Sequence, residues 1–327
     1  MIRVGTIGTS VITDDFIHAL KQVNEYQLLC VYSRDEDKAR MYAEKHNCQV
    51  FTSNWDAFLS NDQLDAIYVA SPNDLHFEQS VAILRAGKHA ITEKPFVSNV
   101  HEFEALMAVV KETGKFCFDA ILPLHHPNLK VIKEALPSIG KLKMMISNMV
   151  QYSSRYKMVL NGQIPNIFNP EHSGGALMDL GVYSTSISIA LFGKPESLTY
   201  TCNKLTNGID TSGTMVLKYP SFIVTSTFGK DSFGVNNMTF CGEEASLHIP
   251  LQPSRLLGVE RVTIQEHEEL GVADLRDGMV YELLDFADII ENNDWQTYQS
   301  FMDITKDVIN CLDEARRQND IVFRTDR

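Results

Sequence analysis

Short apolar runs alternate with amphipathic segments through residues 1–120. The runs that predict buried strands are residues 2–7, 28–32, 49–51, 65–70, 89–92 and 115–119. The segments that predict helices follow the turn at residues 8–10 and lie at 38–45, 74–86 and 100–113. Strands that alternate with helices are typical of a doubly wound parallel sheet. We therefore predict one α/β domain over residues 1–120.

The pattern changes near residue 142. Strand-like runs follow one another at residues 142–150, 198–203, 214–219, 223–228, 237–241, 245–249 and 261–266. Runs joined mainly by short turns favour an antiparallel sheet. Residues 281–318 return to a helical pattern, and Phe301, Thr305, Val308 and Leu312 form an apolar stripe that we expect in the core. Residues 121–327 are predicted to be an α+β domain with a large open, mostly antiparallel sheet, whose last helix could pack against the first domain.

Composition excludes several classes of partner. The 327 residues carry a formal net charge of −13, and the basic runs at 141–143 and 316–317 are too short to form a patch for nucleic acid. We found no apolar run near the roughly 20 residues of a membrane span, and no N-terminal signal segment. The six cysteines are scattered singly, which favours reduced thiols and no zinc site. We expect a cytoplasmic protein without a metal ion.

The first strand leads into a tight turn and then a helix, which is the arrangement that holds a dinucleotide pyrophosphate. We predict that this contact is made by Gly8, Thr9, Ser10, Val11 and Ile12.

The glycine fingerprint of this turn is incomplete. Only Gly8 matches G-x-G-x-x-G, with Ser10 at the second glycine position and Thr13 at the third. Ser10 would hold the cofactor further away or bind it through its hydroxyl, and Thr13 implies looser packing of helix on strand. Any strand, turn and helix of an α/β protein would look similar, so the motif alone leaves that alternative open.

The end of the second strand bears on the choice of cofactor. An acidic residue there would bind the ribose 2′-hydroxyl of NAD, whereas the sequence reads Ser33-Arg34. A hydroxyl followed by a guanidinium suits the 2′-phosphate of NADP. We predict NADP as the preferred cofactor over NAD, although Asp35 would favour NAD if the strand ended later.

Three longer motifs follow: A-S-P-N-D-L-H at 70–76, E-K-P at 93–95 and G-G-A-L-M-D-L-G-V-Y at 174–183. With these, nearly the whole chain resembles the glucose-fructose oxidoreductase and inositol dehydrogenase family, Gfo/Idh/MocA. The sugar and trans-dihydrodiol dehydrogenase branch is most similar, since it also has tyrosine, here Tyr183, where inositol dehydrogenases have histidine.

The resemblance implies a Rossmann domain that binds a nicotinamide cofactor and a second domain that binds the substrate. It implies an NAD(P)-dependent oxidoreductase that transfers a hydride between the nicotinamide and a secondary hydroxyl or carbonyl of a sugar, polyol or dihydrodiol-like substrate. It also extends the predicted cofactor site to Ser71, Pro72, Asn73, His76, Glu93 and Lys94.

The resemblance assigns catalysis to Lys94, Tyr183 and Asp179. A free phenol has a pKa of about 10, so Tyr183 would act as a base only if a cation such as Lys94 favoured its phenolate. Asp179 precedes Tyr183 by four residues and would share its helix face, where it could orient the substrate or Lys94. The alternative for these three residues is a buried salt bridge beside a packed tyrosine.

Leu124 departs from the related branch, which usually has arginine there. Losing a guanidinium removes hydrogen-bond donors for the substrate, so the substrate could differ. His125, His126, Tyr156 and Asn166 could replace those donors or be structural.

Two other functions stay open on the sequence: a catalytically silent cofactor-binding sensor or regulator, and an NAD-dependent glycosidase. We also expect a homodimer or homotetramer formed through the outer face of the C-terminal sheet. Val216, Ile223, Val224 and Phe228 could belong to that face or to the core.

Overall fold

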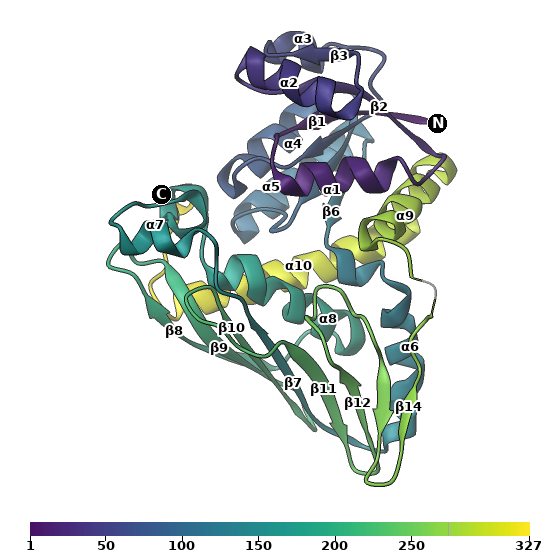
Figure 1. Ribbon diagram of the computed structural model, residues 1–327, viewed down its shortest axis with the longest axis vertical. Coiled ribbons are helices and arrows are strands. Elements are labelled where there is room, and N and C mark those ends of the chain that lie inside the picture. Colours follow the sequence, from purple (N-terminus) through teal and green to yellow (C-terminus); the bar gives the residue numbers. More distant parts are fainter. Residues whose placement is uncertain (274) are drawn as a thin grey trace. The chain divides into compact units, whose positions relative to one another are not determined.

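The computed structural model describes residues 1–273 and 275–327, and the chain divides into two compact units. We call them the N-terminal unit, Met1–Ala120 with Met279–Asp303, and the C-terminal unit, Ile121–Gly278 with Ile304–Arg327. Figure 1 labels many of their helices and strands. Each unit is described by itself.

The N-terminal unit contains a six-stranded parallel sheet in the order β3-β2-β1-β4-β5-β6. Its strands are β1 Ile2–Ile7, β2 Tyr26–Tyr32, β3 Val50–Thr52, β4 Ala66–Val69, β5 His89–Glu93 and β6 Cys117–Ala120. This order is that of the doubly wound Rossmann fold, in which the connections diverge between β1 and β4. The predicted parallel sheet is confirmed.

Helices connect these strands. They are α1 Val11–Leu20, α2 Glu36–His46, α3 Trp55–Leu59, α4 His76–Arg85 and α5 Val100–Thr113, with a 3₁₀ turn η1 at Asn73–Leu75. α5 has clear end signals: the Asn99 side chain accepts a hydrogen bond from the Glu102 amide at 2.9 Å, and Gly114 ends the helix at a φ of 64°.

The helical region predicted at 281–318 consists of two helices, α9 Gly278–Asn292 and α10 Trp295–Arg317. Residues 279–303 pack within the N-terminal unit, where Phe286 stacks on Phe118 at 4.4 Å and the Tyr298 hydroxyl donates to the Cys117 carbonyl at 3.0 Å. The rest of α10 belongs to the C-terminal unit, and Thr305, Val308 and Leu312 of the predicted stripe are buried.

The C-terminal unit contains an eight-stranded sheet in the order β14-β13-β12-β11-β7-β10-β9-β8. Its strands are β7 Leu142–Val150, β8 Ser197–Lys204, β9 Asp210–Lys218, β10 Ile223–Gly229, β11 Asn237–Gly242, β12 Ser246–Ile249, β13 Glu260–Val262 and β14 His267–Glu269. Neighbouring strands are antiparallel except for the central parallel pair of β7 and β10. The predicted mostly antiparallel sheet is confirmed, with β14 as a strand that the pattern missed.

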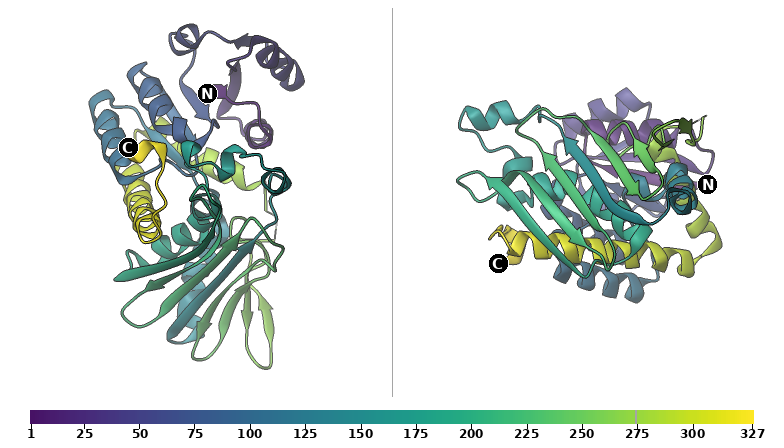
Figure 2. Two further views of the ribbon diagram at one scale, coloured as in Figure 1. Left: turned by 90° about the vertical axis from the view of Figure 1, so that its left-hand side faces the viewer. Right: turned by 90° about the horizontal axis from the view of Figure 1, so that it is seen from below.

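The two faces of this sheet differ. On β10 the side chains of Val224 and Phe228 are buried in the core, whereas Ile223 is 40% exposed on the outer face. Val216 on β9 is half-buried and shares the outer face, since it pairs with the half-buried Thr225 of β10. Of the four residues proposed for an exposed face, Val224 and Phe228 are therefore core residues. The strands of this sheet lie side by side in the right-hand view of Figure 2.

The helices of this unit are α6 Pro127–Ala135, α7 Tyr156–Leu160, α8 Val182–Phe192 and the end of α10, together with a π-helical turn, η6, at Leu177–Gly181. Short 3₁₀ turns lie at Leu122–Leu124, Leu136–Ile139, Asn166–Phe168, Pro170–His172 and Arg324–Asp326. The segment Pro170–Phe192 is long and apolar enough to cross a membrane, which the sequence pattern missed, but 78% of its most apolar window is buried inside the structure. That burial is typical of a core helix.

Candidate functional site

The predicted cofactor residues gather at one edge of the parallel sheet. Gly8 follows β1, Ser33 follows β2, Ser71 follows β4 and Lys94 follows β5. Open α/β sheets bind ligands outside the carboxyl ends of their strands, at the point where the connections diverge. The structure therefore brings these loops to the edge where a dinucleotide would bind.

Gly8 is required by the close approach of two loops. Its φ is 107°, and a Cβ atom there would lie 2.7 Å from the carbonyl oxygen of Ala70, which follows β4. The next residues face solvent, and the Val11 side chain is 74% exposed. The Ser10 hydroxyl makes no capping hydrogen bond to α1 and lies 3.4 Å from that of Thr13, which is completely buried. The exposed turn can thus accept a phosphate through backbone amides and the Ser10 hydroxyl.

Asp35 is engaged by α2. Its carboxylate caps that helix by accepting a hydrogen bond from the Lys38 amide at 3.0 Å, and the Lys38 ammonium lies 3.9 Å away. Its own amide contacts the Ser33 hydroxyl at 3.4 Å. Within the described part of the chain, the exposed Arg34 forms no ion pair. The acidic residue that could have favoured NAD therefore has a structural role, while the guanidinium is available for a ligand.

His76 connects two of the predicted loops. Its Nδ1 lies 2.9 Å from the Pro95 carbonyl oxygen, and its Nε2 lies 3.1 Å from that of Ser71. Burial lowers the pKa of His76, and a neutral imidazole donates through only one nitrogen at a time. Either tautomer ties one loop to the first turn of α4. The Lys94–Pro95 peptide bond, in the loop that follows β5, is cis.

Glu93, the last residue of β5, is buried and accepts a hydrogen bond from the Tyr68 hydroxyl at 2.7 Å. This contact joins β5 to β4 near the edge that carries Lys94. Glu93 therefore has an evident structural partner, and its part in binding a cofactor stays a prediction.

The glycine pair of the C-terminal motif is required by close packing. A Cβ atom on Gly174 would lie 2.5 Å from the Ile167 carbonyl oxygen. Gly175 has a φ of 113°, and a Cβ atom there would collide with the Asp210 carboxylate. The same carboxylate accepts hydrogen bonds from the Leu177 amide at 2.6 Å and from the Tyr200 hydroxyl at 2.8 Å. Asp210 thereby fixes the start of the π-helical turn, and burial raises its pKa.

Asp179 lies in this π-helical turn, and Tyr183 lies in the first turn of α8. Single π-helical turns occur often at functional sites. The Lys230 ammonium donates to Asp179 Oδ2 and forms an ion pair with it. Lys230 follows β10 directly and is only 8% exposed, and Tyr183 is equally buried. The helix that carries Tyr183 is also buried. Serine hydroxyls on this helix donate to its own backbone carbonyls, as Ser188 Oγ does to the Ser184 carbonyl at 2.7 Å.

Sequence reasoning missed Lys230 and Asp210. Each is distant in sequence from the motif it contacts, so no local spacing connects them. One signal was present: Lys230 is a single cation directly after an apolar run, at the carboxyl end of a strand. Lys94 belongs to the N-terminal unit, and Asp179 and Tyr183 belong to the C-terminal unit.

The remaining candidates have structural partners or surroundings. The His126 Nδ1 accepts the Asn128 amide at 3.2 Å and caps α6, and burial lowers the pKa of His126 to about 4. Tyr156 packs against Phe168 at 5.6 Å. Leu124 packs against the core of the C-terminal unit. Among residues 1–273 and 275–327, no three His, Cys, Asp or Glu side chains are grouped to hold a metal ion.

Two family descriptions match this chain. Residues 2–120 match the Gfo/Idh/MocA oxidoreductase family with its NAD-binding Rossmann fold, and residues 135–248 match the Gfo/Idh/MocA C-terminal domain. The predicted family, the fold class and the oxidoreductase assignment are thereby confirmed.

Individual relatives agree with the family match. The chain is 34% identical to scyllo-inositol 2-dehydrogenase (NADP(+)) IolU of Bacillus subtilis (strain 168) over the whole of both chains. It is 24% identical to trans-1,2-dihydrobenzene-1,2-diol dehydrogenase of Sus scrofa, over 67% of this chain and 65% of that protein. Its fold matches that of KijD10, a 3-ketoreductase from Actinomadura kijaniata crystallised with NADP and TDP-benzene, with a TM-score of 0.86, 23% identity and 97% of each chain covered. The chain belongs to the Gfo/Idh/MocA oxidoreductase family.

Proposed function

We propose that the protein is an NADP-dependent dehydrogenase or reductase acting on a secondary hydroxyl or carbonyl of a ring polyol or sugar. The observation that carries this proposal is that two features occur together in this chain. The N-terminal unit has a nucleotide-binding sheet edge with Lys94 at the end of β5, and the C-terminal unit has Asp179 and Tyr183 on successive helical turns. The Bacillus subtilis relative, which matches over its full length, is named for an inositol and NADP, which favours a polyol substrate.

The residues at the sheet edge fit a phosphorylated nucleotide. The residues that follow Gly8 are exposed and α1 begins at Val11, so backbone amides at this helix start can face a pyrophosphate. Ser33 and Arg34 offer a hydroxyl and a guanidinium for a 2′-phosphate, while the Asp35 carboxylate is held by α2. We therefore assign NADP as the preferred cofactor. When bound, the nicotinamide supplies the hydride chemistry of the family.

Residues of this chain would transfer the proton and orient the substrate. During oxidation the Tyr183 phenolate oxygen takes the proton of the substrate hydroxyl, and during reduction the Tyr183 phenol returns that proton to the carbonyl oxygen. We assign Lys94 to donate a hydrogen bond to a substrate oxygen. We assign Asp179, whose carboxylate is oriented by Lys230, to accept a hydrogen bond from the substrate.

The test measures the initial rate of reaction for each combination of cofactor and substrate. NADP and NAD are each combined with scyllo-inositol, myo-inositol, D-xylose, D-glucose and a trans-dihydrodiol, and reduced nicotinamide is followed by its absorbance. We expect turnover with a ring polyol or sugar and a higher kcat/KM with NADP. Turnover with NAD alone would contradict the cofactor assignment, and the absence of turnover on every substrate would contradict the enzyme assignment.

We also propose that two copies associate through the outer face of the C-terminal sheet. Ile223 and Met144 are 40% and 39% exposed there, and they occupy paired positions on the adjacent strands β10 and β7. An exposed apolar pair on a broad sheet favours burial against a second copy. Replacing Ile223 by Lys should shift the molar mass measured by light scattering to that of a smaller species. An unchanged mass would contradict this interface.

A further inference from the structure

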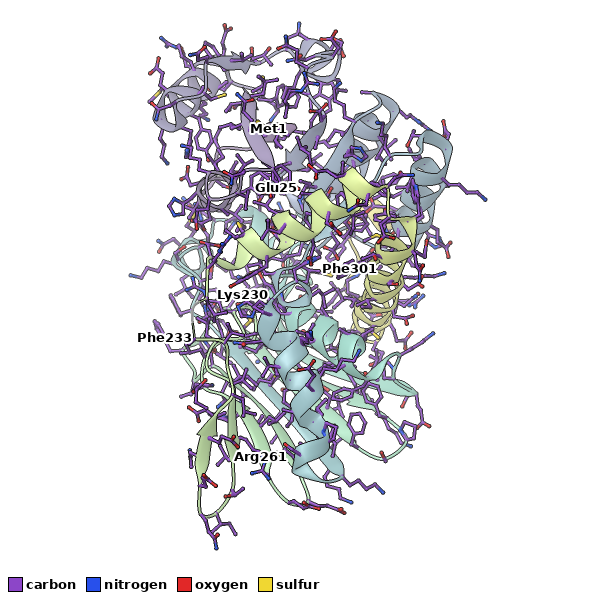
Figure 3. The ribbon with its side chains drawn as sticks, turned by 90° about the vertical axis from the view of Figure 1, so that its right-hand side faces the viewer. Met1, Glu25, Lys230, Phe233, Arg261 and Phe301 are labelled. Atoms are coloured by element: carbon purple, nitrogen blue, oxygen red, sulfur yellow. The ribbon has the colours of Figure 1, made fainter. Side chains whose placement is uncertain are left out.

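Lys230 is a buried cation beside the predicted catalytic carboxylate. Figure 3 labels it together with Phe233, which lies further along the loop after β10. The Lys230 amide donates to the Thr211 carbonyl at 2.8 Å, and the Lys230 carbonyl accepts the Ser153 amide at 2.8 Å. These contacts fix the backbone on both sides, so the side chain leaves a rigid strand end toward the π-helical turn that carries Asp179.

The neighbouring carboxylate does not compete for this lysine. Asp231 accepts hydrogen bonds from the Thr211 hydroxyl at 2.7 Å and the Ser212 hydroxyl at 3.0 Å. An ammonium that is this well buried is stabilised by an ion pair, which Asp179 supplies. The aspartate side chain is 21% exposed and that of Lys230 is 10% exposed, so the pair reaches the surface of the unit.

A paired ammonium and carboxylate complement one hydroxyl group. Lysine has three N–H donors and directs one of them to Asp179, which leaves donors for another oxygen. A carboxylate has several acceptor positions and can also accept a hydrogen bond from a hydroxyl at the same time. One hydroxyl can thus accept from the lysine and donate to the aspartate.

We propose that Lys230 and Asp179 form a hydroxyl-binding pair that recognises the hydroxyl next to the reacting carbon, so that the preferred substrates are vicinal diols on a ring. This inference rests on the proposed oxidoreductase function and specifies its substrate. Lys230 is then both a substrate-binding residue and the residue that orients Asp179.

The test compares the wild type with Lys230→Met, which keeps a long apolar stem without charge, and with Lys230→Arg. Lys218→Met, at an exposed lysine of β9, is the matched control. The probes are scyllo-inositol and a pair that differs by one hydroxyl, trans-1,2-cyclohexanediol and cyclohexanol. The affinity of the NADPH-loaded enzyme for scyllo-inositol is measured by calorimetry, and kcat and KM are measured with NADP.

A hydrogen bond to a charged group contributes about 1.5–3 kcal/mol, so Lys230→Met should lose about 10- to 150-fold in scyllo-inositol affinity. Its kcat/KM should fall at least about 10-fold for the diol and less than about 3-fold for cyclohexanol, with partial recovery in Lys230→Arg. NADPH affinity should stay unchanged, whereas the melting temperature of Lys230→Met should fall, because Asp179 loses its ion-pair partner. An equal loss on diol and cyclohexanol, or no loss, would overturn the inference while leaving the proposed function intact. Wild-type binding of scyllo-inositol without turnover of it or of any other compound in the substrate panel would instead contradict the proposed function, and a wild type that neither binds nor oxidises any of these compounds would overturn both.

Discussion

The two units build their candidate sites in opposite ways. In the N-terminal unit, loops that follow consecutive strands of one parallel sheet meet at a shared edge, and the positions of backbone atoms decide the geometry, as at Gly8. In the C-terminal unit, side chains from distant segments decide it: Asp210 holds the start of the π-helical turn, and Lys230 holds Asp179. A site built by backbone tolerates changes of individual side chains, whereas a site built by paired side chains depends on each of them.

This difference explains what the sequence could predict. The parallel sheet, the candidate cofactor edge and the candidate residues Asp179 and Tyr183 follow from local patterns and from family resemblance. The ion pair of Lys230 and Asp179 joins residues 51 positions apart, and only the folded chain brings them together. The sequence pattern placed the start of α2 at residue 38, whereas the structure places it at Glu36. Asp35 is therefore the cap of this helix, which the pattern could not predict. The division of exposed and core residues on β10 depended on strand orientation, which one apolar run does not define.

The largest expected effect is at Tyr183 in the C-terminal unit. Replacing it by Phe removes the proton acceptor but keeps the buried ring, so kcat should fall by about 10²- to 10⁴-fold. NADPH affinity, measured by fluorescence titration, should change less than about 2-fold, because the residues proposed to bind the cofactor belong to the N-terminal unit. Full activity in this variant would remove Tyr183 from the mechanism. Tyr219→Phe is the control, since that buried tyrosine of the C-terminal unit donates its hydroxyl to the Gly193 carbonyl and has no proposed role in catalysis.

The scaffold of the C-terminal site should also be sensitive. Gly175→Ala places a Cβ atom against Asp210 at a positive φ, and we expect a loss of about 2–4 kcal/mol in the free energy of unfolding. Gly162 provides the matched control, because its φ is 77° and a Cβ atom there meets no atom within 4 Å. Gly162→Ala should cost about 1 kcal/mol. Equal losses in urea titrations of the two variants would show that the contact with Asp210 is unimportant.

Acid stability offers a test in both units. Burial lowers the pKa of His89 in the N-terminal unit and of His126 in the C-terminal unit to about 4. Unfolded histidine titrates near pH 6.5, so below that pH the unfolded chain binds protons that the folded chain excludes, and stability declines until about pH 4. Each histidine should contribute a loss of about 2 kcal/mol at pH 5 relative to pH 7.

His126→Asn keeps a good cap for α6 and removes the titrating group. Its free energy of unfolding should therefore fall less between pH 7 and pH 5 than that of the wild type, by about 1–2 kcal/mol. Chemical denaturation at both pH values measures this difference. An identical pH dependence would contradict a neutral, buried His126.

The smallest expected effect is on cofactor choice in the N-terminal unit. Arg34→Ala should raise KM for NADP by about 5- to 10-fold and leave that for NAD unchanged, because only NADP carries the 2′-phosphate. Arg40→Ala, at an exposed arginine paired with Asp37 on α2, is the control. A parallel loss with both cofactors would place Arg34 at a shared part of the nucleotide instead.

A polyol dehydrogenase that transfers hydride to NADP produces one NADPH for each ketone, so the amounts of these two products distinguish it from the alternatives. The enzyme is incubated with NADP and scyllo-inositol, and NADPH formed is compared with ketone formed. We predict equal amounts of both. Sugar product without NADPH on a glycoside substrate would indicate a glycosidase that regenerates its cofactor, and tight cofactor binding without any ketone would indicate a sensor; either result would contradict the dehydrogenase.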